Sequence, residues 1–222
     1  MIKKISLLLF SFCFIFLSCR KELGRGPIAY IPQEVKTFFN YKPGSYWVYQ
    51  DSISGDYDSV ECQEVIVDTL MFTYHDWKND GKLKVESYEL MQLNNIIYHP
   101  DNSYTPYNGI NISSKSDRAV DGVFQIKRED FYGQSWYLIY PFTVGNHFIN
   151  DQADTVVISA LLDHYSINSM TFDSVLVSDV LLKHNNSERN MRYYSVKGIG
   201  IIQIKSRYDT TNYKLVSYHI EY

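Results

Sequence analysis

The chain has 222 residues, a length that fits one large β domain or two smaller ones and that can bury a core without disulfides or metal. Hydrophobic residues make up 45%, charged residues 21% and aromatic residues 16%, which excludes an intrinsically disordered chain. The formal net charge is −4 and the sequence has no basic run or stripe, so it argues against a nucleic-acid partner.

The N-terminus has the parts of a secretory signal. Lys3 and Lys4 give a positive start, the uncharged apolar stretch Ile5–Leu17 follows, and the small residue Ser18 precedes Cys19. At about 1.5 Å per residue this stretch covers roughly 20 Å as a helix, which is short of a hydrocarbon core of about 30 Å. The pattern therefore predicts a cleaved leader at residues 1–18 and not a spanning helix.

The order Phe16-Leu17-Ser18-Cys19 resembles a bacterial lipobox, although that pattern prefers Leu, Val or Ile where Phe16 stands. The resemblance implies that Cys19 is lipidated and that residues 19–30 form a charged, flexible tether. The membrane is then a partner through Cys19, and we expect a lipid anchor in the cell envelope, at the outer membrane, on its periplasmic or its surface face. The alternative is an ordinary secretory cut beside an incidental cysteine.

The other two cysteines fit this reading. Cys13 leaves with the leader, so Cys62 has no disulfide partner in the mature chain and the fold relies on its core. We expect Cys62 to be a small buried hydrophobe, because no neighbouring residue pattern suggests an activated thiol.

The predicted elements begin with one short helix or turn at residues 32–39, where Pro32 suits the first turn and apolar residues fall on one side. From Tyr46 onward the pattern indicates strands. The tight-turn sequence Lys78–Lys82 separates Met71–Trp77 from Leu83–Leu93, which predicts a hairpin.

Two later stretches, Val156–Leu162 and Val175–Leu182, are apolar on both parities, as expected for strands covered on two sides. The C-terminal stretches Ile201–Tyr208 and Tyr213–Tyr222 alternate and predict an antiparallel hairpin. In them Gln203 is expected on the polar face and His219 in solvent, and one apolar face is expected to comprise Val216, Tyr218, Ile220 and Tyr222. The fold class is therefore all-β and mainly antiparallel, built as a sandwich or as a curved half-barrel sheet, with one short N-terminal helix.

The sequence also contains a weak internal echo. The segment Tyr41–Trp47 has a counterpart in Pro141–Phe148, and Tyr57–Val60 has one in Phe172–Val175, in the same order. The β-rich domain at residues 31–222 is then interpreted as two related halves, about 31–110 and 130–222, joined within residues 100–135. The alternative is chance similarity among β strands.

Three segments together resemble a group of uncharacterised Bacteroidota envelope lipoproteins, in which a lipobox signal peptide precedes a β-rich domain. They are Pro43–Tyr49, Val144–Asn146 and Tyr194–Ile202, all of them strand and turn patterns. The resemblance extends over most of the mature chain. It implies a β-rich envelope lipoprotein and no particular chemistry.

Nothing in the sequence forms a convincing catalytic or metal constellation. The six histidines are far apart and irregularly spaced, which argues against a metal site. Gly133–Tyr137 lacks the closing glycine of a nucleophile elbow, and Glu86 and Glu89 would lie on opposite faces of a strand. We expect no cofactor, no metal and no enzymatic activity.

Asp followed by Ser or Thr recurs before an aliphatic residue or Thr, and this triplet resembles the general O-glycosylation acceptor of Bacteroidota envelope proteins. The bland explanation is that Asp and Ser favour turns while Val and Ile begin strands. The candidate acceptors are Ser52, Ser59, Thr69, Thr155, Ser174 and Thr210.

Aromatic residues give the one hint of a ligand. Tyr98, Tyr104 and Tyr107 lie in a predicted long loop, where tyrosine would offer a flat surface and a hydroxyl to a glycan or a peptide. The alternative is that these tyrosines pack back onto the sheet. The leading functional hypothesis is a non-enzymatic binding lipoprotein for a glycan, peptide or lipid, the lipid being held by an apolar sheet interior. A structural or assembly subunit of an envelope complex is the second hypothesis, and a hydrolase ranks below both.

Overall fold

The structure is a computed structural model that describes residues 28–75, 83–101, 103–113, 124–130, 133–149, 155–184, 187–206 and 212–222. The chain divides into two compact units. The smaller unit comprises residues 1–28 and 71–87, and its described part consists of strand segments. The larger unit comprises residues 29–70 and 88–222 and contains the described buried apolar side chains. No helix in the described part of the chain is long and apolar enough to cross a membrane.

The described chain is almost entirely antiparallel β, which confirms the predicted fold class. Thirteen strands form one open sheet in the order β7-β6-β5-β4-β3-β2-β13-β12-β11-β10-β9-β8, with β1 paired to β4. The elements in chain order are β1 (Ile28–Ala29), α2 (Gln33–Phe38), β2 (Tyr46–Asp51), β3 (Tyr57–His75), β4 (Leu83–Tyr98), β5 (Tyr104–Ser113), β6 (Phe124–Asp130), β7 (Gly133–Tyr140), β8 (His147–Ile149), β9 (Thr155–Ile167), β10 (Met170–His184), β11 (Ser187–Val196), β12 (Gly200–Ser206) and β13 (Asn212–His219).

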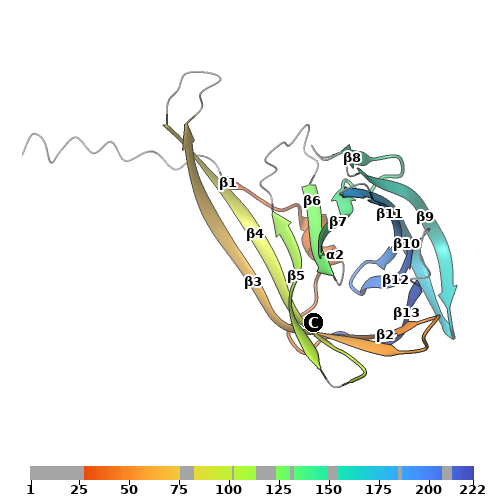
Figure 1. Cartoon of the computed structure of the whole chain (residues 1–222). Coiled ribbons are helices and arrows are strands. Elements are labelled where there is room, and N and C mark those ends of the chain that lie inside the picture. The colour runs from red at the N-terminus through yellow and green to blue at the C-terminus, as the bar shows by residue number, and fades with distance from the viewer. Residues whose placement is uncertain are drawn as a thin grey trace, which may run out of the picture. The chain divides into compact units, whose positions relative to one another are not determined.

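The strand order contains two six-stranded meanders. Strands β2 to β7 follow one another as neighbours, strands β8 to β13 do the same, and the antiparallel pair β2–β13 joins the two sets (Figure 1). Within the larger unit the sheet curves, so that β7 also lies against β9 and β10. The change from one meander to the next falls at residues 141–146, between β7 and β8.

The two halves of the sequence echo form the same turn. Gly44 donates its amide to the Cys62 carbonyl at 2.9 Å, and Cys62 donates back to the residue after the glycine at 2.8 Å. Gly145 and Ile158 repeat this exchange at 2.8 and 2.9 Å. Both glycines have positive φ, 95° and 89°, a conformation that residues with a Cβ rarely adopt. The repeated sequence segments therefore form the same glycine turn at the start of each meander.

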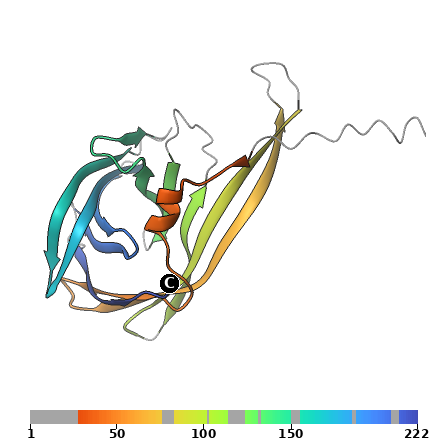
Figure 2. The ribbon, with the colours of Figure 1, turned by 180° about the vertical axis from the view of Figure 1, so that it is seen from behind.

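Helix α2 confirms the helix predicted at residues 32–39. Pro32 stands at the N-cap position with φ −55° and ψ 140°, and Val35 and Phe38 are buried. The Phe38 ring packs against Phe142 with centroids 4.8 Å apart, and the Phe38 carbonyl accepts a hydrogen bond from Gly198 at 2.9 Å. Figure 2 shows the helix, in orange, between the green and the blue strands of the sheet. One short helix thus ties the two meanders together.

Both predicted hairpins are present as neighbouring strands, with corrections of detail in the second. Strands β3 and β4 are neighbours, and the turn at 78–82 lies outside the described residues. Strands β12 and β13 pair antiparallel, but Leu215 is the fully buried residue of β13, while Tyr218 is 37% exposed. A register shift between Leu215 and Ser217 changes the alternation there, so the predicted apolar face at Val216 and Tyr218 was wrong.

Burial of the two apolar stretches differs. Val175, Leu176 and Val177 of β10 are all buried, which confirms a strand covered on two sides. In β9, Val156 and Ile158 are buried but Leu161 is 55% exposed, so the prediction fails for the second half of that strand.

The buried side chains form one apolar core, and Cys62 is part of it. Cys62 is fully buried and free, as predicted, and burial raises the pKa of its thiol to about 11. The thiol is therefore protonated at neutral pH. The largest fully buried side chains are Tyr193, Phe39, Leu93, Ile97, Ile112, Leu138, Ile139, Ile158, Ile202 and Leu215.

Candidate functional site

The tyrosines singled out in the sequence lie on strands and not in a long loop. Tyr98 ends β4 and Tyr104 begins β5, and the two are direct cross-strand partners around a turn at residues 99–103. Tyr104 is 65% exposed and Tyr98 is 39% exposed. Tyr107 takes the register position opposite Asn95, three residues beyond Tyr104. The structure brings Tyr98 and Tyr104 together as cross-strand partners.

The turn between them is fixed by side chains. The His99 amide donates to the Ser103 carbonyl at 2.9 Å, and Ser103 donates from its amide and hydroxyl to the Asp101 carboxylate at 2.9 and 2.5 Å. These bonds lower the pKa of Asp101. The His99 ring lies 3.1 Å from the Asp58 carboxylate on β3. The tip of the β4–β5 hairpin is therefore held against the neighbouring strand.

Tyr98 and Tyr104 are two members of a longer row across the sheet. Tyr98 donates its hydroxyl to Glu61 Oε2 at 3.3 Å. Glu61 pairs with Tyr46 of β2, and Tyr46 pairs in turn with His219 of β13. Directly paired residues of an antiparallel sheet share a face, so the row crosses five neighbouring strands on one side. We call it the tyrosine row and define it as Tyr104, Tyr98, Glu61, Tyr46 and His219.

The tyrosine row is exposed and polar at its edges. Tyr46 is 42% exposed and stacks on His219 with ring centroids 5.8 Å apart, while His219 lies 2.8 Å from the Glu221 carboxylate. Partial desolvation and the nearby Glu61 carboxylate raise the pKa of the Tyr98 phenol, so it remains a hydrogen-bond donor. His219 is solvent-exposed, as predicted. Four strand spacings of about 4.8 Å give the row a length of roughly 19 Å.

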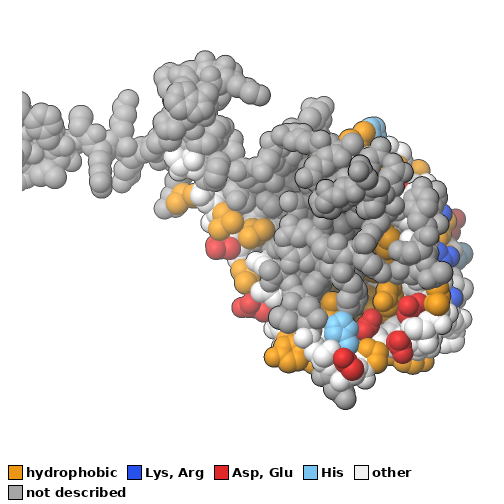
Figure 3. All heavy atoms as spheres, viewed as in Figure 1, with side chains coloured by type: hydrophobic (Ala, Val, Ile, Leu, Met, Phe, Trp, Pro, Cys, Tyr) orange, Lys and Arg blue, Asp and Glu red, His pale blue; other side chains and the backbone are white. Residues whose placement is uncertain are grey.

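Figure 3 shows the end of the molecule where β2 and the β4–β5 turn lie. Hydrophobic, acidic and histidine side chains are mixed along that lower edge, with no large uniform patch among the coloured atoms. A flat aromatic surface interrupted by hydrogen-bonding groups suits a ligand that has both apolar faces and hydroxyls.

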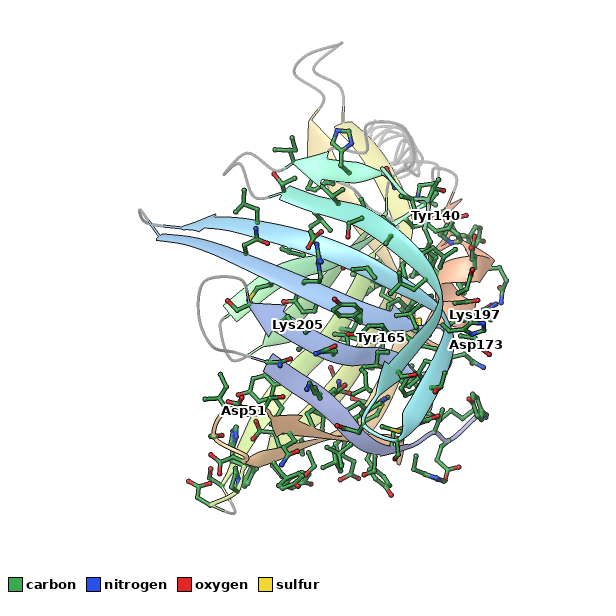
Figure 4. The ribbon with its side chains drawn as sticks, turned by 90° about the vertical axis from the view of Figure 1, so that its right-hand side faces the viewer. Asp51, Tyr140, Tyr165, Asp173, Lys197 and Lys205 are labelled. Carbon is green, nitrogen blue, oxygen red and sulfur yellow. The ribbon has the colours of Figure 1, made fainter. Side chains whose placement is uncertain are left out.

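A second polar cluster lies on β9 to β13. Tyr165 stacks on Tyr194 at 4.6 Å and donates to Gln203 Oε1 at 2.6 Å, which leaves Gln203 buried although it was predicted on a polar face. Burial and the adjacent Tyr194 raise the pKa of Tyr165 to about 12. Lys205 Nζ lies 5.6 Å from the centre of the Tyr194 ring. Figure 4 labels Tyr165 and Lys205 on this part of the sheet. These side chains contact one another, so their polar groups are satisfied within the cluster.

An ion pair between Arg192 and Asp179 lies beside this cluster. Arg192 donates to both carboxylate oxygens of Asp179, at 2.7 and 2.8 Å, and these bonds raise the pKa of the guanidinium. A bidentate pair of this kind holds neighbouring strands in register.

One small cavity of about 30 Å³ opens beside the core. Its lining includes Trp47 and Asn95, and Asn95 Oδ1 accepts no hydrogen bond within the described residues. Ligand pockets for drug-sized molecules run from about 300 to 1,000 Å³, so this cavity is far too small for an acyl chain. It offers no support to the lipid hypothesis.

The candidate acceptor residues differ in accessibility. Ser52, Thr69 and Ser174 are exposed, Ser59 and Thr155 are half-buried, and Thr210 lies outside the described residues. Ser174 has a positive φ of 54° within β10, so it does not stand at the start of a strand. Cys19 also lies outside the described residues, and its lipidation stays a prediction.

Titratable residues are mostly dispersed. Within the described ranges no three His, Cys, Asp or Glu side chains gather as metal ligands would. His164 and His147 are exposed on different strands.

Glu89, dismissed as half of an acid–base pair, is buried and accepts hydrogen bonds from the Ile31 amide at 2.9 Å and from Lys36 Nζ at 2.6 Å. Sequence reasoning missed this structural role, for which the signal was an acidic residue inside an apolar strand.

The tyrosine row itself had only a partial signal in the sequence. Tyr98 and Tyr104 were found because they cluster locally, whereas Tyr46 and His219 come from opposite ends of the chain. The chain matches no family model, no curated protein and no solved structure, so function has to be inferred from the geometry of the described residues.

Proposed function

We propose that the protein is a lipid-anchored envelope lipoprotein that binds a carbohydrate, without catalysis, through the tyrosine row. The observation that carries this proposal is the alignment of Tyr104, Tyr98 and Tyr46 with Glu61 and His219 on one exposed face. Tyrosine offers a flat amphipathic surface at low entropic cost, and sugar rings present C–H faces with hydroxyls at their rims. The carboxylate and imidazole supply acceptors and donors for those hydroxyls.

The anchor is supported by the sequence of the leader. The apolar stretch Ile5–Leu17 and the lipobox-like Leu17-Ser18-Cys19 belong together, and residues 19–30 would separate the β-rich domain from the membrane. A lipid on Cys19 would hold the β-rich domain at the membrane.

A carbohydrate fits the row better than the other ligands considered. An acyl chain would need a large apolar cavity, and the cavity that the described residues form beside Trp47 and Asn95 is too small for one. A stable protein interface uses about 20–30 residues on each side, whereas the row is one residue wide. A narrow strip of aromatic rings about 19 Å long suits a short oligosaccharide chain.

The full-length lipoprotein, extracted from its membrane in detergent, provides the test. Affinity for a panel of soluble polysaccharides is measured for the wild type, Tyr46→Ala, Tyr98→Ala and the control Tyr30→Ala, an exposed tyrosine outside the row. We expect the two row variants to lose about tenfold in affinity, the effect of removing an aromatic contact worth 1–2 kcal/mol, and the control to bind normally.

Two outcomes would overturn this function. Equal binding by all four proteins would exclude the row as the ligand site. If no polysaccharide binds but an envelope protein is retained by the wild type and released by Tyr98→Ala, the row is a protein-docking surface and the assembly hypothesis takes its place.

A second measurement addresses the anchor and the acceptor residues. We expect the intact mass of the extracted protein to show loss of residues 1–18 and gain of a diacyl or triacyl group on Cys19. Sugar-sized increments beyond that would support modification of Asp-Ser/Thr sites, for which the exposed Ser52, Thr69 and Ser174 are the most accessible described candidates. An unmodified mass with cleavage elsewhere would refute the anchor.

A further inference from the structure

Glu61 is the only carboxylate within the tyrosine row, and it stands at its centre. It faces Tyr46 as a cross-strand partner on one side and accepts the Tyr98 hydroxyl through Oε2 on the other. The residue is half-buried, and Oε1 accepts no hydrogen bond from the described part of the chain. One carboxylate oxygen is therefore committed to positioning Tyr98 while the other is left for a ligand.

The surroundings of Glu61 reinforce its negative potential. Glu221 closes the far end of the row against His219, whereas the buried Asp58 pairs with Tyr49 on the other face of the sheet. Asp101 lies at the turn beyond Tyr98, and its lowered pKa keeps it ionised. Within the row His219 is the group that can carry positive charge, and it already lies beside the Glu221 carboxylate, while His99 contacts Asp58 on the other face. A ligand on the row meets the Glu61 carboxylate between the aromatic rings of Tyr46 and Tyr98.

We propose that Glu61 is the specificity-determining residue of the tyrosine row and that its ligand is a saccharide bearing amino groups, with acidic saccharides rejected. This inference rests on the proposed carbohydrate-binding function. A protonated amine can bond Oε1 while its sugar ring covers Tyr46 or Tyr98, whereas a uronate or sulfate group at the same place would be repelled. Neutral saccharides gain the aromatic contact alone.

The test uses the full-length lipoprotein in detergent at about pH 6, where glutamate is ionised and amino sugars are largely protonated. The probes are oligomers of glucosamine, glucose and galacturonate, of equal length. The proteins are the wild type, Glu61→Gln, Tyr46→Ala and Asp163→Asn. Gln keeps an acceptor for Tyr98, and Asp163→Asn makes the same charge change at an exposed site on β9, away from the row.

We expect the wild type to bind glucosamine oligomers most tightly and galacturonate oligomers least. An exposed charge pair is worth about 0.2–1 kcal/mol, so Glu61→Gln should weaken glucosamine binding by up to about fivefold and strengthen galacturonate binding by a similar factor. Binding of glucose oligomers should stay the same, and Asp163→Asn should match the wild type. Raising the salt to about 0.5 M should remove most of the difference between the probes.

Each other result contradicts a distinct step. If Tyr46→Ala loses binding but Glu61→Gln leaves the order of probes unchanged, the selectivity role fails and the carbohydrate site stands. If Glu61→Gln weakens binding of all three probes equally, Glu61 acts as a positioning acceptor for Tyr98 and not through its charge. If the wild type binds none of the probes or any other polysaccharide, the proposed function fails and the inference fails with it.

Discussion

At the scale of single residues, Glu89 shows how a buried carboxylate fastens helix α2 to strand β4. We expect Glu89→Ala to lower the free energy of unfolding by about 1–3 kcal/mol, because the buried Ile31 amide loses its acceptor and Lys36 its partner. Glu89→Gln retains one acceptor oxygen and should cost less. Urea unfolding of both variants beside the wild type tests the expectation, and equal losses would contradict it.

Cys62 gives a second residue-scale prediction. Its full burial and its raised pKa of about 11 leave almost no accessible thiolate at pH 8. In the form proposed above, without the leader and with lipid on Cys19, we expect the folded protein to react with a thiol reagent such as DTNB only as fast as it unfolds. In denaturant one thiol per chain should react at once. Rapid labelling of one thiol in the native protein would show that this strand is open to solvent.

At the scale of elements, the repeated turn can be tested by a matched pair of substitutions. Gly44→Ala and Gly145→Ala both force a Cβ into a positive-φ conformation, which costs about 1–2 kcal/mol. A Cβ on Gly44 would also lie 3.4 Å from Glu221 Cγ, whereas one on Gly145 would meet nothing within 4 Å. We expect both variants to be destabilised in urea unfolding, Gly44→Ala at least as much as Gly145→Ala. An unchanged midpoint in either would argue against a shared backbone requirement.

The elements were largely predictable where the pattern is local. Pro32 and the apolar spacing after it gave the helix, and alternation gave the β12–β13 hairpin. Prediction failed where tertiary pairing overrode local signals. Pro106 lies in β5, opposite Ile96, although proline and glycine nearby suggested a long loop. No local sequence signal reveals the register shift after Leu215 or the pairing of β13 with β2. For this reason the sequence did not predict Glu61, Tyr46 and His219 as members of the tyrosine row.

At the scale of the whole molecule, the buried Cys62 and the half-buried Tyr165 make the fold sensitive to alkali. The pKa of Cys62 rises from 9.0 to about 11, and that of Tyr165 from 10.0 to about 12. The folded form holds these protons above the pH at which the unfolded chain releases them. Their contribution to stability is therefore complete below about pH 9 and is lost as the pH rises toward 12.

Cys62 and Tyr165 should not change the urea midpoint between pH 7 and about pH 8.5. From about pH 9 upward we expect the midpoint to fall. Cys62→Ala should lower the midpoint at every pH but weaken its decline between about pH 9 and 11. An equally steep decline in that variant would assign the alkaline loss to other groups.

The pairing of β2 with β13 also governs how the fold can be reached. Trp47 donates its indole N–H to the Ile199 carbonyl, 152 residues away, and Ser45 lies beside Glu221, 176 residues away. Within each meander, neighbouring strands can pair locally as hairpins. The β2–β13 pairing must instead bring together segments from opposite ends of the domain, and such long-range contacts form slowly. Until then both β2 and β13 present open strand edges that could join another copy. The β2–β13 pairing is thus the step at which folding competes with aggregation, and the same step places Tyr46 and His219 side by side.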